Sequence, residues 1–347
     1  MRLSQMPDKS KAGAYSFMPL DLATASRSRL AEVAGLTARR EEELIHLLAG
    51  PGADRCRSFG IFDRERLVGF QAFVYRPMRR EERCIHSFRS EFTIALPELR
   101  GTGVFAQFYR WTLTEIRREF GSSSTYIWGE TRHRGWLKYG FKMWKRYSFY
   151  QVRSPSGEAY PGLPQLAGWP YRRVAAAVGS MPLPKSKESA VERLTSLSHG
   201  QYERYAYLAR PHRSRVSYDE AGFKARFEHN PFYAYEFWLV DRALIVVRVS
   251  DGWAMISDVL AGSAADYMDA IVPVIETHSR SVLQGNIMSE VRAPYFWINL
   301  RLGFVPFLGG GSFVEDNRTC PTIQLADIPL YESYGFGVPA APIGSAA

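Results

Sequence analysis

The hydrophobic pattern of the first half predicts a mixture of helices and strands. Ser26–Gly50 repeats apolar residues at helical spacing and stops at a Gly-Pro pair, a usual helix end. Ser58–Tyr75 is apolar with a charged turn in its middle, which indicates two strands. Ile85–Leu96 indicates another strand and Val104–Phe120 a helix.

The second half shows a similar order of elements. Ala190–Leu197 and Ser217–Asn230 favour helices, Ala234–Gly262 favours three strands with turns between them, and Ala264–Arg280 favours a helix. Both halves then end with an aromatic-rich short helix, a Gly-Phe pair and a strand. This order indicates an internal repeat of about 150 residues.

Between the halves the composition changes to Pro, Gly, Ala and Ser, which disfavours a long regular element. We therefore predict a first module over residues 1–153, a linker over 154–187, a second module over 188–330 and a flexible tail over 331–347. The predicted fold class is α/β with mixed, α+β-type sheets: two tandem modules, each with a central, mostly antiparallel sheet flanked by helices.

Composition places the chain among soluble globular proteins, with 46% hydrophobic and 23% charged residues in 347. No apolar run is long enough for a transmembrane helix, and the N-terminus lacks the apolar core of a signal peptide, so we expect a cytoplasmic protein without a membrane span. The three cysteines have no CxxC spacing, so we expect neither a metal site nor a disulfide framework.

Charge is distributed unevenly. The first 153 residues hold 27 Lys and Arg against 16 Asp and Glu, a net charge of +11, whereas the rest hold 17 against 19, a net charge of −2. The first half is thus expected to bind something anionic. Nucleic acid, an acidic membrane surface and a phosphorylated cofactor are all anionic partners that such a positive charge would attract.

One short stretch narrows the choice. In "LRGTGVFAQFY" (Leu99–Tyr109), the two glycines fit either a tight strand-to-helix turn or a cradle in which backbone N–H groups and a helix N-terminus hold a pyrophosphate. Arg100 would add positive charge, while Gly101 and Gly103 would let a phosphate approach the backbone. No Walker lysine follows, and the GxGxxG pattern of a Rossmann fold is missing.

At these residues the sequence resembles the GNAT acetyltransferase superfamily, which binds acetyl-CoA through an R/Q-x-x-G-x-G/A loop. Arg100 and Gly103 in "LPELRGTGVF" match that pattern, and Phe105 departs from the usual small residue, as in acyltransferases linked to polysaccharide and surface-glycan synthesis. "WLKYGFKMWKRYSFY" is similar to the superfamily's closing segment. The likeness covers Phe59–Val152.

The second half is similar to the second module of tandem GNAT-like and Fem-like proteins, through "FKARFEHNPFYAYEFWLV" and "YFWINLRLGFVPF". Where a pyrophosphate loop should lie, "ISDVLAGSAADY" has no RGxG. We therefore expect a degenerate module that binds no CoA and that shapes an acceptor pocket or packs on the first module. His229 and Asn230, in "EHNPFY", fit a helix end before Pro231 or an acceptor-binding role.

The resemblance implies direct transfer of an acyl group from acetyl-CoA, or another acyl-CoA, to an amine of a small molecule or a sugar. A backbone N–H near Thr93–Leu96 would hold the oxyanion, and a bulge there would open a slot for pantetheine. The cofactor-binding residues that the resemblance implies are Thr93, Ile94, Ala95, Leu96, Arg100, Gly101, Thr102, Gly103, Val104 and Phe105.

The motif does not supply the general acid, because Trp136 occupies the position of the family's usual tyrosine. Tyr139, directly before Gly140, is the candidate acid if its ring points into the cleft; otherwise it is a core aromatic.

Glu91 and Glu130 are the candidate bases. Strand alternation would put Glu91, Thr93 and Ala95 on one face. In the alternative, Glu91 forms an ion pair with Arg89.

Two alternative functions stay open. A Fem-like transferase would take an aminoacyl group from charged tRNA, and a non-catalytic GNAT-like protein would only bind. We expect a nucleic-acid partner solely under the first alternative. The expected partner is therefore a small-molecule or sugar-linked amine, and the residues leave the oligomeric state open.

Overall fold

The computed structural model divides the chain into two compact units. The residues that it describes are 15–50, 53–80, 83–122, 125–131, 137, 139–151, 177, 183, 191–209, 215–216, 218–250, 253–278, 282–287 and 296–315. The first unit comprises Met1–Met143 with Ser312–Ala326, and the second comprises Trp144–Gly311 with Asp327–Ala347. Of the predicted linker only residues 177 and 183 are described, and the predicted tail lies outside the description.

The first unit is built on a mixed sheet. Its strands are β1 (Tyr15–Leu20), β2 (Arg57–Asp63), β3 (Arg66–Tyr75), β4 (Met78–Arg80), β5 (Arg83–Ala95) and β6 (Thr125–Thr131). β1, β2, β3 and β5 pair antiparallel in that order, and β6 pairs parallel to β5. The short β4 forms a hairpin with β5. The predicted strand pair over Ser58–Tyr75 and the predicted strand over Ile85–Leu96 are confirmed.

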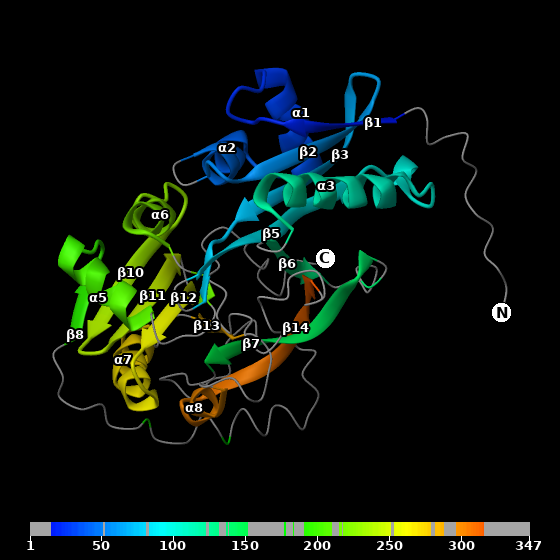
Figure 1. Ribbon diagram of the computed structural model, residues 1–347. Coiled ribbons are helices and arrows are strands. Elements are labelled where there is room, and N and C mark those ends of the chain that lie inside the picture. Colours follow the sequence, from blue (N-terminus) through cyan, green and yellow to red (C-terminus); the bar gives the residue numbers. More distant parts are fainter. Residues whose placement is uncertain are drawn as a thin grey trace. The chain divides into compact units, whose positions relative to one another are not determined.

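Helices cover both faces of this sheet (Figure 1). They are α1 (Arg27–Thr37), α2 (Glu41–Ala49), the short η2 (Pro97–Leu99) and α3 (Val104–Phe120). The rings of Phe17 and Phe59 lie 5.9 and 5.5 Å from the Trp111 ring of α3. Phe62, on the opposite face of β2, lies under Arg29 of α1 at 4.7 Å. Coverage on both faces explains why β3 is buried along nearly its whole length.

The second unit also contains both parallel and antiparallel strands. They are β7 (Phe141–Gln151, which starts in the first unit), β8 (Val191–Leu194), β9 (Arg215–Val216), β10 (Ala234–Val240), β11 (Ala243–Ser250), β12 (Trp253–Ala261), β13 (Val282–Ile287) and β14 (Phe304–Glu315, which ends in the first unit). β8, β10, β11 and β12 pair antiparallel in that order, β13 lies parallel to β12, and β7 is antiparallel to β13. The predicted helix over Ala190–Leu197 is wrong, because Val191–Leu194 extends along β10 instead and hydrogen bonds to it.

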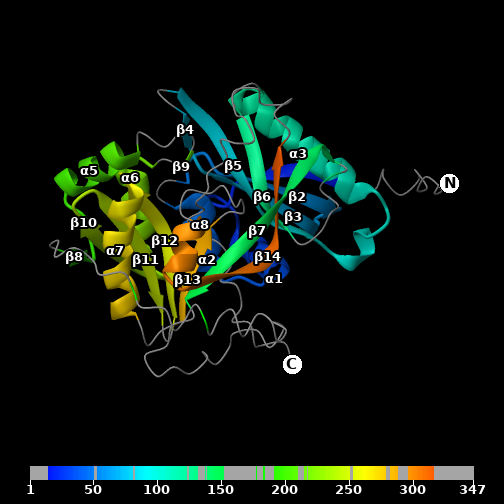
Figure 2. The same ribbon diagram turned by 90° about the horizontal axis from the view of Figure 1, so that it is seen from below.

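The helices of this unit are α5 (His199–Ala209), α6 (Glu220–Phe223), the π-helical turn η4 (Lys224–Glu228), α7 (Ala264–Thr277) and α8 (Phe296–Arg301). Figure 2 shows α7 lying along β10, β11 and β12. Trp238, Ile245 and Ile271 belong to the core between them. On the opposite face of β10, Phe237 packs against Phe223 of α6 at 5.6 Å between ring centroids.

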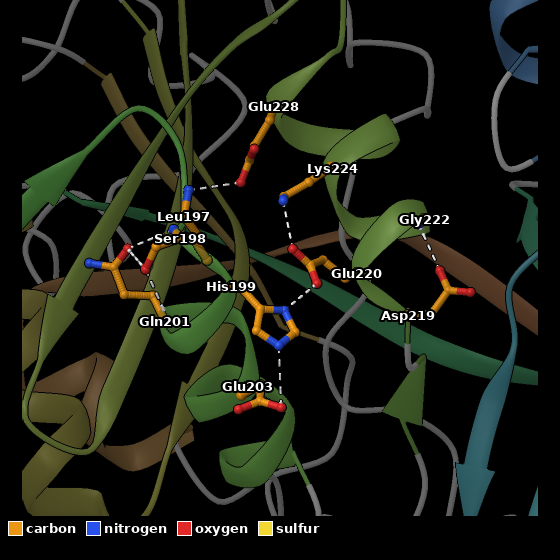
Figure 3. A network of polar contacts seen from close by, with 10 residues as sticks. All are labelled: Leu197, Ser198, His199, Gln201, Glu203, Asp219, Glu220, Gly222, Lys224 and Glu228. Carbon is orange, nitrogen blue, oxygen red and sulfur yellow. Dashed lines mark hydrogen bonds and ion pairs between the residues drawn. The ribbon is translucent and has the colours of Figure 1, made fainter.

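A polar network joins α5 to α6 and η4 (Figure 3). His199 Nδ1 lies 2.7 Å from Glu220 Oε2, and Lys224 Nζ donates to Glu220 Oε1 at 2.6 Å. Glu228 Oε1 accepts from the Leu197 amide at 2.8 Å, just before α5 begins. The three helical segments are thereby tied together at the surface.

The two units share an order of elements. β2, β3 and β5 are followed by α3 and then by β6 parallel to β5; β10, β11 and β12 are followed by α7 and then by β13 parallel to β12. The third strand of each series also carries an irregularity in register, at Phe92–Thr93 in β5 and at Ser257 in β12.

Candidate functional site

The site begins at a bulge in β5. Glu91 lies opposite Ala72 and Ile94 lies opposite Phe70, so that both Phe92 and Thr93 face the single residue Gln71. Phe92 has a positive φ of 49°, a conformation that a bulky residue adopts only where the surrounding structure imposes it. The bulge predicted before the glycine loop is therefore confirmed.

The bulge changes which side chains share a face. Glu91 pairs with Ala72 and Ala95 pairs with Gly69, three residues along β3, so the two lie on opposite faces. The expectation that Glu91, Thr93 and Ala95 share one face is wrong, because the extra residue interrupts the alternation.

Gln71 holds the bulge from across the sheet. Its buried side-chain amide donates to the carbonyl of Ala72 at 2.7 Å, the hydroxyl of Ser90 at 2.9 Å and the carbonyl of Glu91 at 3.1 Å. Its Oε1 accepts from Thr93 Oγ1 at 2.6 Å. One side chain thus occupies the hydrogen-bonding positions on both sides of the bulge.

Past the bulge, β5 and β6 are no longer paired. Their parallel pairing ends at Ser90 opposite Gly129, although β5 continues to Ala95 and β6 to Thr131. This part of β5 is therefore not hydrogen bonded to β6, as a slot between the strands requires. The amide of Leu96 donates to the carbonyl of Val68 at 2.9 Å, so it is already engaged on the β3 side.

The loop after β5 is held by its own hydrogen bonds. The amides of Leu99 and Arg100 donate to Leu96 and Pro97, closing the short η2 helix. The Thr102 hydroxyl donates to the Leu99 carbonyl at 2.8 Å and accepts from the Val104 amide at 3.2 Å. These contacts fix the turn into α3 without using the glycine amides.

The N-terminus of α3 stays open. Gly101 and Gly103 have φ of 76° and 79°, and a Cβ on Gly101 would meet no atom within 4 Å. No acceptor among the described residues takes the amides of Gly101, Gly103, Phe105 or Ala106, and α3 has no side-chain cap. With the helix dipole and the exposed Arg100, these donors form a binding place for an anion.

Two tyrosines lie beside this opening. Tyr109, one turn into α3, is fully buried with its hydroxyl near Ser90, and burial is the chief cause of its raised pKa. The Tyr139 ring lies 5.1 Å from that of Tyr109. Tyr139 is half-buried, and burial raises the pKa of its hydroxyl while nearby Arg110 opposes the rise. The structure therefore brings Tyr139 near the bulge, through Tyr109 and Ser90.

The candidate base Glu91 is buried in an ion pair. Its Oε1 lies 2.8 Å from Arg89 Nε, and both side chains are buried. The guanidinium of Arg89 lies 5.8 Å from the Trp128 ring, whose Nε1 donates to Ser87 at 2.7 Å. This is the alternative pairing that the sequence allowed, and it places Glu91 beside a fixed positive charge.

The other sequence candidates are described in part. The backbone of Glu130 lies in β6, one residue beyond Gly129, where the pairing with β5 ends. Trp136 lies outside the described residues. Sequence reasoning missed Gln71, Ser90 and Tyr109, because their roles arise from contacts between strands and between strand and helix. The one sequence signal was a glutamine within the otherwise apolar run of β3.

The corresponding place in the second unit is closed. Ser263 caps α7 by accepting from the Asp266 amide at 3.2 Å, and its hydroxyl donates to Asp266 Oδ2 at 2.8 Å. The Gly262 amide donates to the Arg242 carbonyl at 2.9 Å. A carboxylate thus already occupies the helix N-terminus, which repels a second anion.

The described ranges contain no group of three or more His, Cys, Asp or Glu side chains arranged to hold a metal ion. None of their helices has both the length and the apolar character needed to cross a membrane.

Comparison with known proteins finds a fold and no sequence family. No family model and no curated protein sequence matches the chain. Solved structures match over most of its length. A conserved protein of unknown function from Enterococcus faecalis, described as a probable N-acyltransferase, aligns with a TM-score of 0.60 at 11% identity, covering 86% of this chain and 72% of that one.

A GCN5-related N-acetyltransferase from Anabaena variabilis aligns with a TM-score of 0.59 at 12% identity, covering 86% of this chain and 72% of that one. N-myristoyltransferase from Saccharomyces cerevisiae with bound myristoyl-CoA aligns with a TM-score of 0.54 at 12% identity, covering 89% and 79%. The chain therefore has the fold of these acyltransferases, and the predicted mixed α/β class is confirmed.

Proposed function

We propose that this protein is an acyl-CoA-dependent N-acyltransferase of the GNAT type. The observation that carries the proposal is the continuity of three features in the first unit: the bulge at Phe92–Thr93, the end of β5–β6 pairing beside it, and the open N-terminus of α3. A ligand with a thioester and a phosphorylated tail needs these features in this order: the bulge for the thioester, the unpaired strand for the arm, and the helix N-terminus for the phosphates.

In this proposal the pyrophosphate of the acyl-CoA binds the amides of Gly101, Gly103, Phe105 and Ala106, with Arg100 adding charge. Thr102 shapes the turn and the buried Val104 anchors the helix start. The pantetheine arm follows β5 past Thr93, Ile94, Ala95 and Leu96, where a backbone N–H freed by the bulge receives the oxyanion.

The reaction is direct. The acceptor amine attacks the thioester carbonyl, a C–N bond forms, and the C–S bond breaks as the tetrahedral intermediate collapses. A base, Glu91 or Glu130, removes the proton from the amine, directly or through water. Tyr139 gives a proton to the departing thiolate, and its raised pKa keeps it in the donating form at neutral pH.

We infer acetyl-CoA as the donor and an amine on a small molecule or a sugar as the acceptor. The neighbours include GCN5-related N-acetyltransferases and an enzyme with bound myristoyl-CoA, which support acyl-CoA as the donor class. The shared order of elements in the two units supports a tandem arrangement with a degenerate second module. A glycan-linked acceptor rests on the sequence resemblance at Phe105 alone.

Calorimetric titration of acetyl-CoA tests the cradle. Gly103→Val places a branched side chain at a φ of 79°, within the loop that carries the open amides, so we expect affinity to fall at least about tenfold. Gly35→Val is the control, because a Cβ at Gly35 in α1 meets nothing within 4 Å and is far along the chain from the loop. Equal affinity in Gly103→Val and the native protein would show that the loop does not hold the cofactor.

Turnover separates catalysis from binding. Release of the CoA thiol is followed with acetyl-CoA and with longer acyl-CoA thioesters over a panel of amines, including amino sugars. Binding without turnover would favour a non-catalytic role. Binding of tRNA that weakens steeply with salt, with no CoA affinity, would favour an aminoacyl-tRNA-dependent transferase instead.

A further inference from the structure

The second unit buries an arginine, Arg248, that forms no ion pair with any residue the structure describes. Arg248 lies on β11 opposite Tyr235 of β10 and Met255 of β12, and it is 6% exposed. Its side chain shares the sheet face of Tyr235, which η4 covers: the rings of Phe227 and Tyr235 lie 5.2 Å apart. A guanidinium is therefore held between a sheet and a helical turn.

Within the described part of the chain, Arg248 has one partner, the Tyr233 ring, whose centroid lies 4.5 Å from the guanidinium carbon. No described carboxylate forms an ion pair with it, and its buried Nη1 has no hydrogen-bond acceptor there. Burying an ion without hydrogen bonds and a counter-ion is costly, and a single ring contact returns only a small part of that cost.

Hydrogen bonds from Asn230 hold the loop that contacts Arg248. Asn230 Oδ1 accepts from the amides of Phe232 and Tyr233 at 3.0 and 3.1 Å, and its Nδ2 donates to the Arg226 carbonyl at 3.2 Å. Asn230 thereby fixes the loop that places Tyr233 on Arg248. This explains the "EHNPFY" stretch, in which Asn230 acts on the loop and His229 stays exposed.

The neighbouring π-helical turn adds a second cation. Arg226, in η4, is 2% exposed, and its guanidinium carbon lies 4.7 Å from the Tyr218 ring and 5.1 Å from the Phe227 ring. π-helical turns are rare and are found frequently at functional sites. Arg226 and Arg248 are thus both buried guanidinium groups that lie against aromatic rings, each against rings of its own.

We propose that Arg248 binds the carboxylate of a small ligand in the second unit. The fork of a guanidinium matches a carboxylate in two parallel hydrogen bonds, and one negative charge neutralises one arginine, whereas a phosphate dianion would leave charge uncompensated. The ligand enters on the side of Tyr233, the half-exposed residue in contact with the guanidinium. The proposal is independent of acyl transfer by the first unit.

The test is thermal unfolding of the full-length protein with increasing sodium acetate, at an ionic strength kept constant with chloride. We expect a saturable rise in the unfolding temperature of the native protein, on the order of 3 °C. Arg248→Met should abolish the rise and, without acetate, should unfold at the same or a higher temperature, because the buried charge is gone. Arg242→Met, at an exposed arginine in the β10–β11 turn, should keep the native response.

Arg248→Lys keeps the charge and removes the fork, so it should fold and should need at least about tenfold more acetate for the same rise. If Arg248→Met does not fold, the acetate response of Arg248→Lys tests carboxylate binding by Arg248 in its place. The proposal is overturned if the native protein shows no saturable rise, if Arg248→Met or Arg248→Lys keeps the native response, or if only phosphate at the same ionic strength raises the unfolding temperature.

Discussion

At the scale of single residues, Gln71 determines the backbone of β5 more than any residue of β5 does. Its amide makes three donor contacts and one acceptor contact around Phe92–Thr93. Removing this side chain would cost each of these buried partners one hydrogen bond, and water could not replace it in the interior.

Gln71→Leu should therefore lower the unfolding free energy by about 2–4 kcal/mol, because two buried carbonyls and two hydroxyls each lose a hydrogen bond. Urea denaturation measures this, with Gln107→Leu on the exposed face of α3 as the control, expected within about 0.5 kcal/mol of the native protein. A change at Gln71 no larger than the control would mean that the bulge forms without it.

Tyr139→Phe should lower the turnover number on the order of 10²-fold and leave the acetyl-CoA dissociation constant unchanged, because it removes a proton donor and keeps the ring. Burial raises the pKa of Tyr139 above its usual 10, so any alkaline decline in the native rate that Tyr139 causes should have its midpoint above pH 10. Steady-state rates between pH 7 and 10.5 check both statements.

Tyr109→Phe is the matched comparison. Tyr109 is fully buried with its hydroxyl near Ser90, so Tyr109→Phe should reduce stability by about 1 kcal/mol and affect turnover less than Tyr139→Phe. The reverse order of the two effects on turnover would transfer the role of acid to Tyr109.

Residue patterns predicted the part of this site that is local in sequence. Gly101 and Gly103 follow an apolar strand and precede a helix, and both adopt the positive φ that only a glycine adopts easily. The bulge, its clamp Gln71 and the Tyr109–Ser90 contact depend on pairing between segments, which no spacing within one segment reveals. The Arg89–Glu91 pair shows the same limit, since the sequence was compatible both with this ion pair and with Glu91 as a catalytic base.

At the scale of elements, the stop between α1 and α2 was missed. The periodicity of Ser26–Gly50 runs on through the break, yet Ala38 takes a φ of 52° and ends α1 in the left-handed conformation. Glycine favours this position, whereas alanine is only tolerated there. The sequence also failed to predict β8. This short strand is stabilised by its pairing with β10, and its own sequence shows little alternation of apolar and polar residues.

Ala38→Gly should raise the unfolding free energy by about 0.5–1 kcal/mol, because glycine adopts this φ without the strain of a Cβ. Ala31→Gly, at an exposed position inside α1, should lower it by about 1 kcal/mol. Urea denaturation of the two variants should give opposite signs. Equal signs would mean that Ala38 is not strained.

The α5–α6 network makes a pH prediction. The hydrogen bond and the charge of Glu220 raise the pKa of the exposed His199, so the pair contributes stability below pH 6.5 that is lost as pH rises through the raised pKa. Histidine titration by NMR should find the pKa of His199 above 6.5 in the native protein. Glu220→Gln should lower it, while Glu276→Gln, at an exposed glutamate at the end of α7, should not.

At the scale of the whole molecule, the contrast between the two units is chemical more than architectural. Both place a helix after an irregular third strand, but α3 begins at a left-handed glycine with open amides, and α7 begins at a serine cap with Asp266 in its first turn. The positive end of the helix dipole is left open in the first unit, whereas in the second unit a carboxylate already lies there.

One acyl-CoA per chain should therefore bind. Calorimetric titration of the native protein should give a stoichiometry of one, and Gly103→Val should abolish that single event without revealing a weaker one. Asp266→Ala, which removes the carboxylate at α7, should leave the stoichiometry at one, because Gly262 and Ser263 supply no open left-handed turn there. A stoichiometry near two in the native protein would place a second cofactor site in the second unit and contradict the assignment of it as degenerate.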